Sequence, residues 1–106
     1  DDKKFIWDSH FIIRSKRQMP PKDFVKMAES GASTLLVGIE SGSEKVRQHM
    51  KKGYTNEDLY YSLNEIFKNN IKVRFLMIIG YPTETAEDFQ KTLATTVLTT
   101  FFVICY

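Results

Sequence analysis

The sequence predicts an α/β fold with a parallel sheet of three to four strands. Compact apolar runs of strand length recur at residues 34–39 and 73–79. A short turn follows each run, and a segment with helix-start signals follows each turn. Strands that alternate with helices at this spacing pair in parallel through right-handed crossovers. The predicted order of elements is β-α-β-α-α-β-α.

The first third of the chain predicts a strand, a helix and a second strand. Residues 5–14 form the first predicted strand, ending near Arg14, although the polar residues 8–10 offer a point at which it breaks. Pro20 and Pro21 supply fixed φ angles for a first helical turn, and Gly31 lies where a glycine often follows a helix. We therefore expect a helix over 21–30. The strand over 34–39 is almost continuously apolar, which is typical of strands covered on both faces.

Two capped helices are predicted in the middle of the chain. Ser41 has capping-box spacing to Glu44, and Ser43 is an equally good N-cap for a helix over 44–52. The next helix, over 56–69, has the capping pair Thr55 and Asp58. Its expected buried stripe is Leu59, Leu63, Ile66 and Phe67.

The last part of the chain predicts a third strand and a further helix. The strand covers 73–79, and Thr85 with Asp88 caps a helix that carries Phe89 and Leu93. Beyond about Leu98, β-branched and aromatic residues predict a fourth strand over 101–106. This stretch also has the composition of an aggregation-prone segment.

Composition narrows the classes of function. The chain has 106 residues, taken as one domain over 1–106, with 42% apolar residues and a net charge of +2. This charge does not indicate a nucleic-acid or membrane-surface partner. One cysteine excludes an internal disulfide and a cysteine-only metal site. The first residue is not Met, and we expect a piece of a longer, cytoplasmic protein.

Glu40 is the main candidate for a binding residue, because ligands bind at the carboxyl ends of parallel strands. Strand alternation puts Leu36, Gly38 and Glu40 on one face, so Gly38 leaves space beside the carboxylate. A carboxylate there accepts two hydrogen bonds, as from a ribose diol. Alternatively, Glu40 satisfies backbone groups at the start of the next helix. The residues alone leave both interpretations open.

Three further positions have a functional and a structural interpretation. Lys52 is a counterion for a ligand carboxylate or, as the residues alone favour, a favourable charge at a helix end. Arg14 binds an anion or is solvated. The turn at Gly80 and Tyr81 brings backbone near an adenine or phosphate, or is an ordinary connection. The histidines and the cysteine have no metal-ligand spacing.

Four motifs in order resemble the middle of a radical S-adenosylmethionine (SAM) enzyme. They are ESGA at 29–32, VGIESGS at 37–43, Lys52 before Tyr54-Thr55, and IIGYPTETAEDF at 78–89. The similarity covers residues 5–93. It is greatest to the cobalamin-domain subgroup that includes anaerobic magnesium-protoporphyrin monomethyl ester cyclase-like proteins.

This resemblance implies a partial TIM-like (β/α)6 barrel in which these strands are the third, fourth and fifth. It also implies a [4Fe–4S] cluster, held by a CxxxCxxC loop, that cleaves SAM reductively to a 5′-deoxyadenosyl radical. The resemblance further implies a small-molecule substrate, and cobalamin as a further cofactor of the subgroup. Glu40 matches a ribose contact, Lys52 a methionine-carboxylate contact, and 78–81 an adenine contact. The predicted cofactor-binding residues are Glu40, Ser41, Lys52, Ile78, Gly80, Tyr81 and Arg14.

The chain departs from the family pattern in three places, one of which is the stretch after Leu93, where the match is poor. It has no CxxxCxxC, so we expect the cluster-binding part of the core to lie outside it and the chain alone to be inactive. Thr83 stands where the family usually has Gly. The competing hypothesis is a non-catalytic βα module that binds a nucleotide or a protein. In either case a sheet cut from a barrel has open strand edges, through which we expect self-association.

Overall fold

The structure is a computed structural model that describes the backbone of residues 5–96 and 100–105 and the side chains of residues 5–94. Its elements are β1 (Trp7–Phe11), α1 (Pro21–Glu29), β2 (Ala32–Glu40), α2 (Glu44–His49), α3 (Asn56–Lys68), β3 (Lys72–Ile79), α4 (Ala86–Thr96) and β4 (Thr100–Cys105). All neighbouring strands pair in parallel, in the order β1-β2-β3-β4. The predicted α/β class, order of elements and fourth strand are confirmed.

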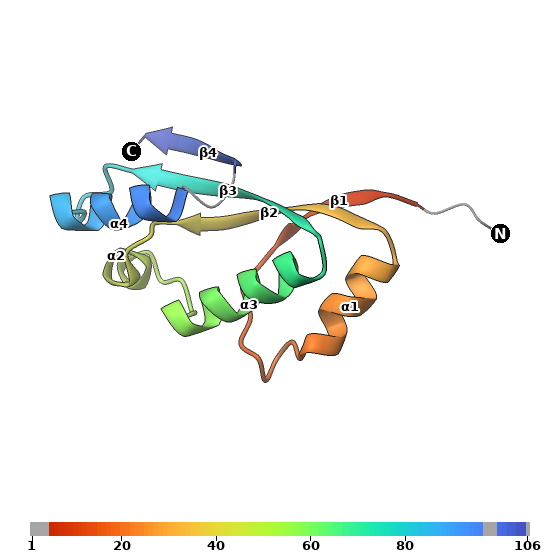
Figure 1. Ribbon diagram of the computed structural model, residues 1–106. Helices are drawn as coiled ribbons and strands as arrows, with labels where there is room; N and C mark the ends of the chain where they lie inside the picture. The colour runs from red at the N-terminus through yellow and green to blue at the C-terminus, as the bar shows by residue number, and fades with distance from the viewer. Residues whose placement is uncertain (1–4, 97–99, 106) are drawn as a thin grey trace.

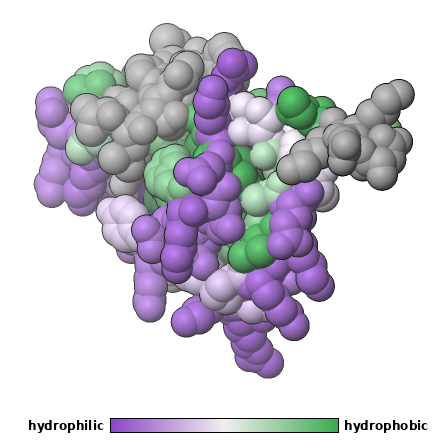
Figure 2. Space-filling model, turned by 45° about the vertical axis from the view of Figure 1, so that its right-hand side comes forward, coloured by the Kyte–Doolittle hydropathy of each residue, from purple (hydrophilic) through white to green (hydrophobic). Residues whose placement is uncertain are grey.

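The helices leave one face of the sheet open. Figure 1 shows α1, α2 and α3 below the sheet, and α4 beside the ends of β2 and β3. Along β2, Leu35, Val37 and Ile39 are buried, and the residues between them are only half-buried. The expectation that both faces of this strand are covered is therefore wrong for the part of the chain that the structure describes. Hydrophilic side chains dominate the lower half of the view in Figure 2, with apolar patches between them.

The core lies between the sheet and helices α1 and α3. Phe24 of α1 has no exposed surface, and Ile66 of α3 has none either. The predicted stripe of α3 is wrong at Phe67, which is 39% exposed. Ser62 is buried instead, because its hydroxyl donates to the Arg14 carbonyl at 3.0 Å and so ties α3 to the segment after β1.

Two predicted boundaries differ from the structure. Strand β1 is shorter than 5–14, and the polar residues 8–10 lie within it rather than breaking it. Helix α2 ends at His49 rather than at 52. There Lys51 takes a φ of 62°, its N–H donates to Gln48, and the N–H of Lys52 donates to the Arg47 carbonyl at 2.9 Å. This is the Schellman pattern of a helix end, so Lys52 belongs to the cap.

The predicted caps form largely as expected. Thr55 and Asp58 make both hydrogen bonds of a capping box at the start of α3. Ser43, one of the two candidates, is the N-cap of α2. Thr85 and Asp88 exchange hydrogen bonds of 2.9 and 3.2 Å where α4 begins. Within the described residues, no helix combines the length and the apolarity that crossing a bilayer requires.

Candidate cofactor-binding site

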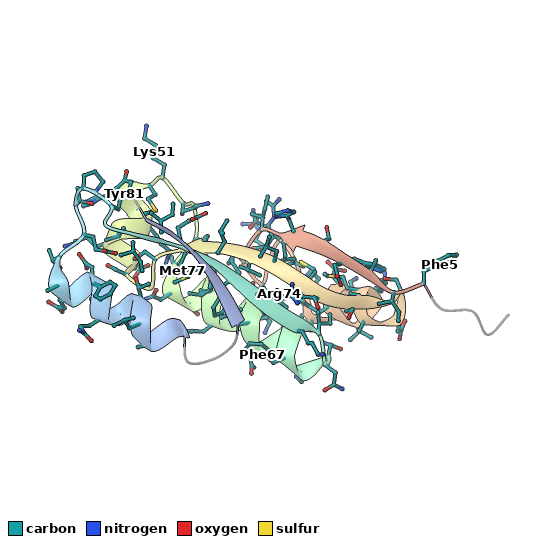
Figure 3. The ribbon with its side chains drawn as sticks, turned by 90° about the horizontal axis from the view of Figure 1, so that it is seen from above. Phe5, Lys51, Phe67, Arg74, Met77 and Tyr81 are labelled. Atoms are coloured by element: carbon teal, nitrogen blue, oxygen red, sulfur yellow. The ribbon has the colours of Figure 1, made fainter. Side chains whose placement is uncertain are left out.

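A cavity of about 460 Å³ opens on the uncovered face, at the carboxyl end of β2. Its walls come from the end of β1 and the segment after it, from β2 and β3, and from the connection between α2 and α3. They comprise His10, Phe11, Ile12, Ile13, Arg14, Gln18, Leu36, Gly38, Glu40, Lys51, Lys52, Gly53, Tyr54 and Leu76. Figure 3 looks onto this face of the sheet. Three predicted site residues, Arg14, Glu40 and Lys52, therefore meet at one cavity.

Strand alternation brings Leu36, Gly38 and Glu40 to the open face, as the sequence predicts. The Glu40 carboxylate lies back over Gly38, since a Cβ built on Gly38 would meet Glu40 Oε1 at 3.0 Å. Contact at this distance is tighter than ordinary van der Waals packing. The space that Gly38 leaves is therefore used by the carboxylate itself.

The backbone at Glu40 is strained. Its φ is 72°, and the Ser41 N–H donates to the Ile39 carbonyl across it at 2.9 Å. This combination is typical of a classic γ-turn, a conformation that is rare for residues other than glycine. Pairing with β3 also shifts register between Gly38 and Glu40, as at a β-bulge. Bulges and strained residues cluster at functional sites, where they redirect a side chain.

One oxygen of the Glu40 carboxylate has no protein partner. Oε1 lies 3.4 Å from Lys52 Nζ, and the Glu40 side chain is only 13% exposed. Oε2 is buried and accepts no hydrogen bond from the described residues. Because buried polar atoms are almost always hydrogen-bonded, Oε2 is an acceptor that lacks its usual donor. The interpretation of Lys52 as a helix-end charge alone does not account for its contact with Glu40.

Two buried residues donate hydrogen bonds to the Glu40 turn, and the sequence analysis missed both. Arg47 has no exposed surface, and its guanidinium donates to the Ser41 carbonyl at 2.9 Å. It also donates to Asn56 and lies 5.3 Å from the centre of the Tyr54 ring. The Tyr54 hydroxyl donates to the Ile39 carbonyl at 3.1 Å. Nothing in the spacing of Arg47 distinguishes it in sequence from a solvated arginine.

The Tyr54 hydroxyl is a stable donor. Burial raises the pKa of Tyr54 to about 12; the Arg47 charge opposes this rise and the Glu40 charge adds to it. The phenol therefore stays protonated well above neutral pH, and its bond to the Ile39 carbonyl persists there.

The helix side of the same turn is a closed hydrogen-bond network. The Ser41 hydroxyl accepts from the Ser43 N–H at 3.1 Å and pairs with the Thr92 hydroxyl at 3.2 Å. The Gly42 N–H donates to Thr92 Oγ1 at 2.9 Å. Ser41 has no exposed surface, so its side chain contacts α4 and not the cavity.

Asp88 joins this network to the turn that precedes α4. It accepts from the Ser43 hydroxyl at 2.7 Å and pairs with Lys45 Nζ at 2.9 Å. The backbone N–H of Thr85, the Ser43 hydroxyl and Lys45 hold the pKa of Asp88 well below its usual range. The carboxylate is thus fixed in its charged form, and sequence reasoning identified only its capping role.

The remaining predicted residues, Ile78, Gly80 and Tyr81, lie at the end of β3 and do not line the cavity. Gly80 has a φ of 84°, and its N–H donates to Glu84 at 2.9 Å. Thr83, the departure from the family pattern, pairs with His49 Nδ1 at 2.7 Å. This contact links the turn after β3 to the end of α2.

Comparison with known proteins assigns the family. The model of the radical SAM superfamily matches residues 3–96. The chain belongs to the radical SAM superfamily. It is 34% identical over 93 residues to a tRNA-2-methylthio-N(6)-dimethylallyladenosine synthase of Carboxydothermus hydrogenoformans, which covers 83% of this chain and 21% of that protein. A ribosomal protein uS12 methylthiotransferase of Sulfurihydrogenibium is 33% identical over 70 residues, covering 64% of this chain and 16% of that protein.

Solved structures confirm the barrel-type fold of this radical SAM chain. The cobalamin-dependent radical SAM enzyme OxsB, with aqua-cobalamin and SAM bound, superposes with a TM-score of 0.75 at 21% identity. The match covers 89% of this chain and 14% of OxsB. The chain spans between 14% and 21% of the curated relatives named above and of similar ones. These comparisons do not support the cyclase-like subgroup.

The two family cofactors fit the chain differently. The unpartnered Oε2 of Glu40 suits a hydroxyl donor of SAM, and Lys52 beside it suits a carboxylate. A [4Fe–4S] cluster does not fit, since the chain has one cysteine and such clusters take thiolate ligands from several. Among the described residues, no group of three metal-ligating side chains exists.

Proposed function

We propose that this chain forms part of the SAM-binding wall of a radical SAM enzyme. The observation that carries the proposal is that Glu40, which lines the cavity, has a buried carboxylate oxygen, Oε2, with no hydrogen-bond partner among the described residues. In this role Glu40 accepts hydrogen bonds from the ribose hydroxyls. Lys52 and Arg14, which line the same cavity, face the methionine carboxylate. Ile78, Gly80 and Tyr81 remain proposed backbone contacts of the adenine.

The chemistry of the intact protein follows from the family. A [4Fe–4S] cluster held by residues outside this chain would supply the electron for reductive cleavage of bound SAM. The residues described here bind and orient SAM for this step. Glu40 supplies a hydrogen-bond acceptor that is already in place, so the protein groups around the ribose need not reorganise during bond cleavage. Lys52 neutralises the methionine carboxylate of SAM.

The finer class that we propose is a methylthiotransferase-like enzyme. Its support is that the similar curated proteins named above carry this activity in their names. The cyclase-like subgroup remains an earlier expectation with no such support. Cobalamin remains a proposed further cofactor of the intact protein, since the structurally similar enzyme OxsB binds it. A cytoplasmic location stays a prediction.

A substrate position is suggested by a second cavity on the open face. It has a volume of about 260 Å³ and shares His10 and Leu36 with the first. Asp8, Thr34 and Arg74 also line it, and Figure 3 shows Arg74 over the sheet. Polar side chains there favour a polar substrate. We therefore propose a small polar molecule, or a polar group of a larger one, next to SAM.

The partners of this chain are tested separately. The net charge of this chain, +2, does not indicate a nucleic-acid partner, and we expect the chain itself to bind none. Saturable binding of unmodified tRNA by this chain, measured by filter binding, would contradict that expectation. The chain alone is expected to self-associate through β1 and β4, the two edges of the sheet. A single monomeric species in sedimentation at high concentration would contradict that expectation.

Calorimetric titration of the intact, cluster-loaded protein with SAM tests the proposal. Glu40→Ala is expected to weaken SAM binding about ten- to a hundredfold, because charged acceptors make the stronger hydrogen bonds. Glu40→Gln keeps one acceptor and is expected to weaken it less. Lys52→Met is expected to weaken binding as well. Lys68→Met is the matched control. Lys68 Nζ forms a 3.6 Å ion pair with Glu65, as Lys52 does with Glu40, but Lys68 does not line the cavity. Unchanged affinity in Glu40→Ala would contradict the proposal.

A further inference from the structure

The two carbonyl groups that flank Glu40 are both held from below. The Ile39 carbonyl accepts two donors, the Ser41 N–H at 2.9 Å and the Tyr54 hydroxyl at 3.1 Å. The Ser41 carbonyl accepts the Arg47 guanidinium at 2.9 Å. Arg47 in turn lies over the Tyr54 ring, 5.3 Å from its centre. The strained turn is therefore fixed on both sides by two buried side chains that contact each other.

We propose that Arg47 and Tyr54 are positioning residues for SAM binding, which hold the Glu40 turn in its left-handed conformation so that the Glu40 side chain lines the cavity. This inference rests on the proposed function, because holding the conformation of Glu40 affects SAM binding only if Glu40 itself binds SAM. A residue other than glycine at a φ of 72° relaxes unless its surroundings determine its conformation. Arg47 and Tyr54 supply that determination.

Arg47 is a poor choice for stability alone. It has no exposed surface, and among the described residues no carboxylate lies within ion-pair distance of it. Its Nε is buried without a hydrogen-bond partner. Burial of a charge without an ion-pair partner carries a desolvation cost. Two of the contacts that Arg47 makes, to the Ser41 carbonyl and the Tyr54 ring, converge on the Glu40 turn, and its hydrogen bond to Asn56 joins it to the start of α3.

The same residue also fixes Lys52. The backbone carbonyl of Arg47 accepts the Lys52 N–H at 2.9 Å in the cap of α2. The side chain of Arg47 thus holds the turn after β2, and its backbone holds the start of the α2–α3 connection. The 3.4 Å pair between Glu40 and Lys52 spans these two points. One buried residue therefore sets the relative positions of the proposed ribose acceptor and carboxylate counterion.

Tyr54→Phe is the sharpest variant, because it removes one hydroxyl and keeps the ring against Arg47. In the intact, cluster-loaded protein we expect about three- to tenfold weaker SAM binding by calorimetry, the loss of one buried hydrogen bond. We also expect a smaller preference for SAM over its 2′-deoxy analogue, because the carboxylate is no longer aligned on the ribose. Tyr61→Phe is the matched control, since the Tyr61 hydroxyl donates to the Met19 carbonyl at 2.7 Å in another part of the fold. It is expected to leave both quantities unchanged.

A double-mutant cycle separates positioning from general destabilisation. If Tyr54 acts through Glu40, adding Tyr54→Phe to Glu40→Ala causes no further loss of SAM affinity. An undiminished loss in the Glu40→Ala background would overturn the inference and leave the proposed function intact. Unchanged affinity in Glu40→Ala alone would instead overturn the proposed function. Thermal melts report the folded fraction of every variant.

Arg47→Lys provides a second, independent test. Lysine keeps the positive charge but lacks the planar fork that reaches the Ser41 carbonyl and Asn56 together. We expect it to weaken SAM binding and to reduce the preference over the 2′-deoxy analogue, as Tyr54→Phe does. A folded Arg47→Lys protein with both quantities unchanged would overturn the inference.

Discussion

The two sides of the turn after β2 differ in how completely their polar groups are satisfied. On the helix side, Ser41, Ser43 and Asp88 are buried, and each has at least two polar partners. On the open side, Glu40 has a strained backbone and a carboxylate oxygen with no partner among the described residues. Neighbouring residues of one motif therefore have different roles. The satisfied side fixes the structure, and the unsatisfied side is available to a ligand.

This contrast explains why the motif contains two glycines with different functions. A Cβ on Gly42 would meet the Lys91 carbonyl oxygen at 2.2 Å, so the glycine permits close packing of α4. A Cβ on Gly38 would meet only the Glu40 side chain, so that glycine accommodates the carboxylate. Gly42 belongs to the helix side of the turn, and Gly38 belongs to the open side.

The largest effect on the helix side is expected from Gly42→Ala. Its Cβ would clash with backbone atoms of α4, which cannot move without breaking the network, and overpacking of this kind costs about 1–3 kcal/mol. We expect a clear fall in the free energy of unfolding, measured by denaturant titration, with SAM affinity per folded molecule retained. Gly53→Ala is the control, because nothing lies within 4 Å of its added Cβ. Equal destabilisation by the two changes would contradict this account.

Acid is expected to weaken the same side through Asp88. Its pKa is lowered in the folded chain, mainly by the Thr85 N–H, so its stabilising effect is complete above the ordinary value of 3.8. That effect is lost as the pH falls below this value towards the lowered pKa. The difference in melting temperature between the wild type and Asp88→Asn should therefore be constant near neutral pH and narrow below about pH 4. A difference that widens in acid would contradict the assignment.

A smaller effect is expected from Ser41→Ala. The hydroxyl is lost from a buried network with Thr92 and Ser43, at a cost of about 1 kcal/mol. Because Ser41 does not line the cavity, SAM affinity should stay the same. Calorimetry and a thermal melt on the intact protein check both parts. Weaker SAM binding with unchanged stability would instead support the earlier assignment of Ser41 to the cofactor.

Sequence patterns were sufficient for the fold and for half of the site. Caps, glycines and apolar periodicity are local, so they predicted every element, and strand alternation predicted that Gly38 and Glu40 share a face. They could not predict the contacts of Arg47, because a buried arginine has no local signature. They also did not predict that Ser41 pairs with Thr92 of α4, because this contact depends on how α4 packs against the turn.

Glu40→Gly tests the central claim most directly, because it removes the side chain with its carboxylate while glycine readily adopts the φ of 72°. Calorimetric titration of the intact, cluster-loaded protein with SAM, with a thermal melt of the same samples, is the measurement. We expect a melting temperature close to that of the wild type and SAM binding weakened about ten- to a hundredfold, as for loss of a charged acceptor. Unchanged SAM affinity together with a lower melting temperature would reduce Glu40 to a structural residue and contradict the account.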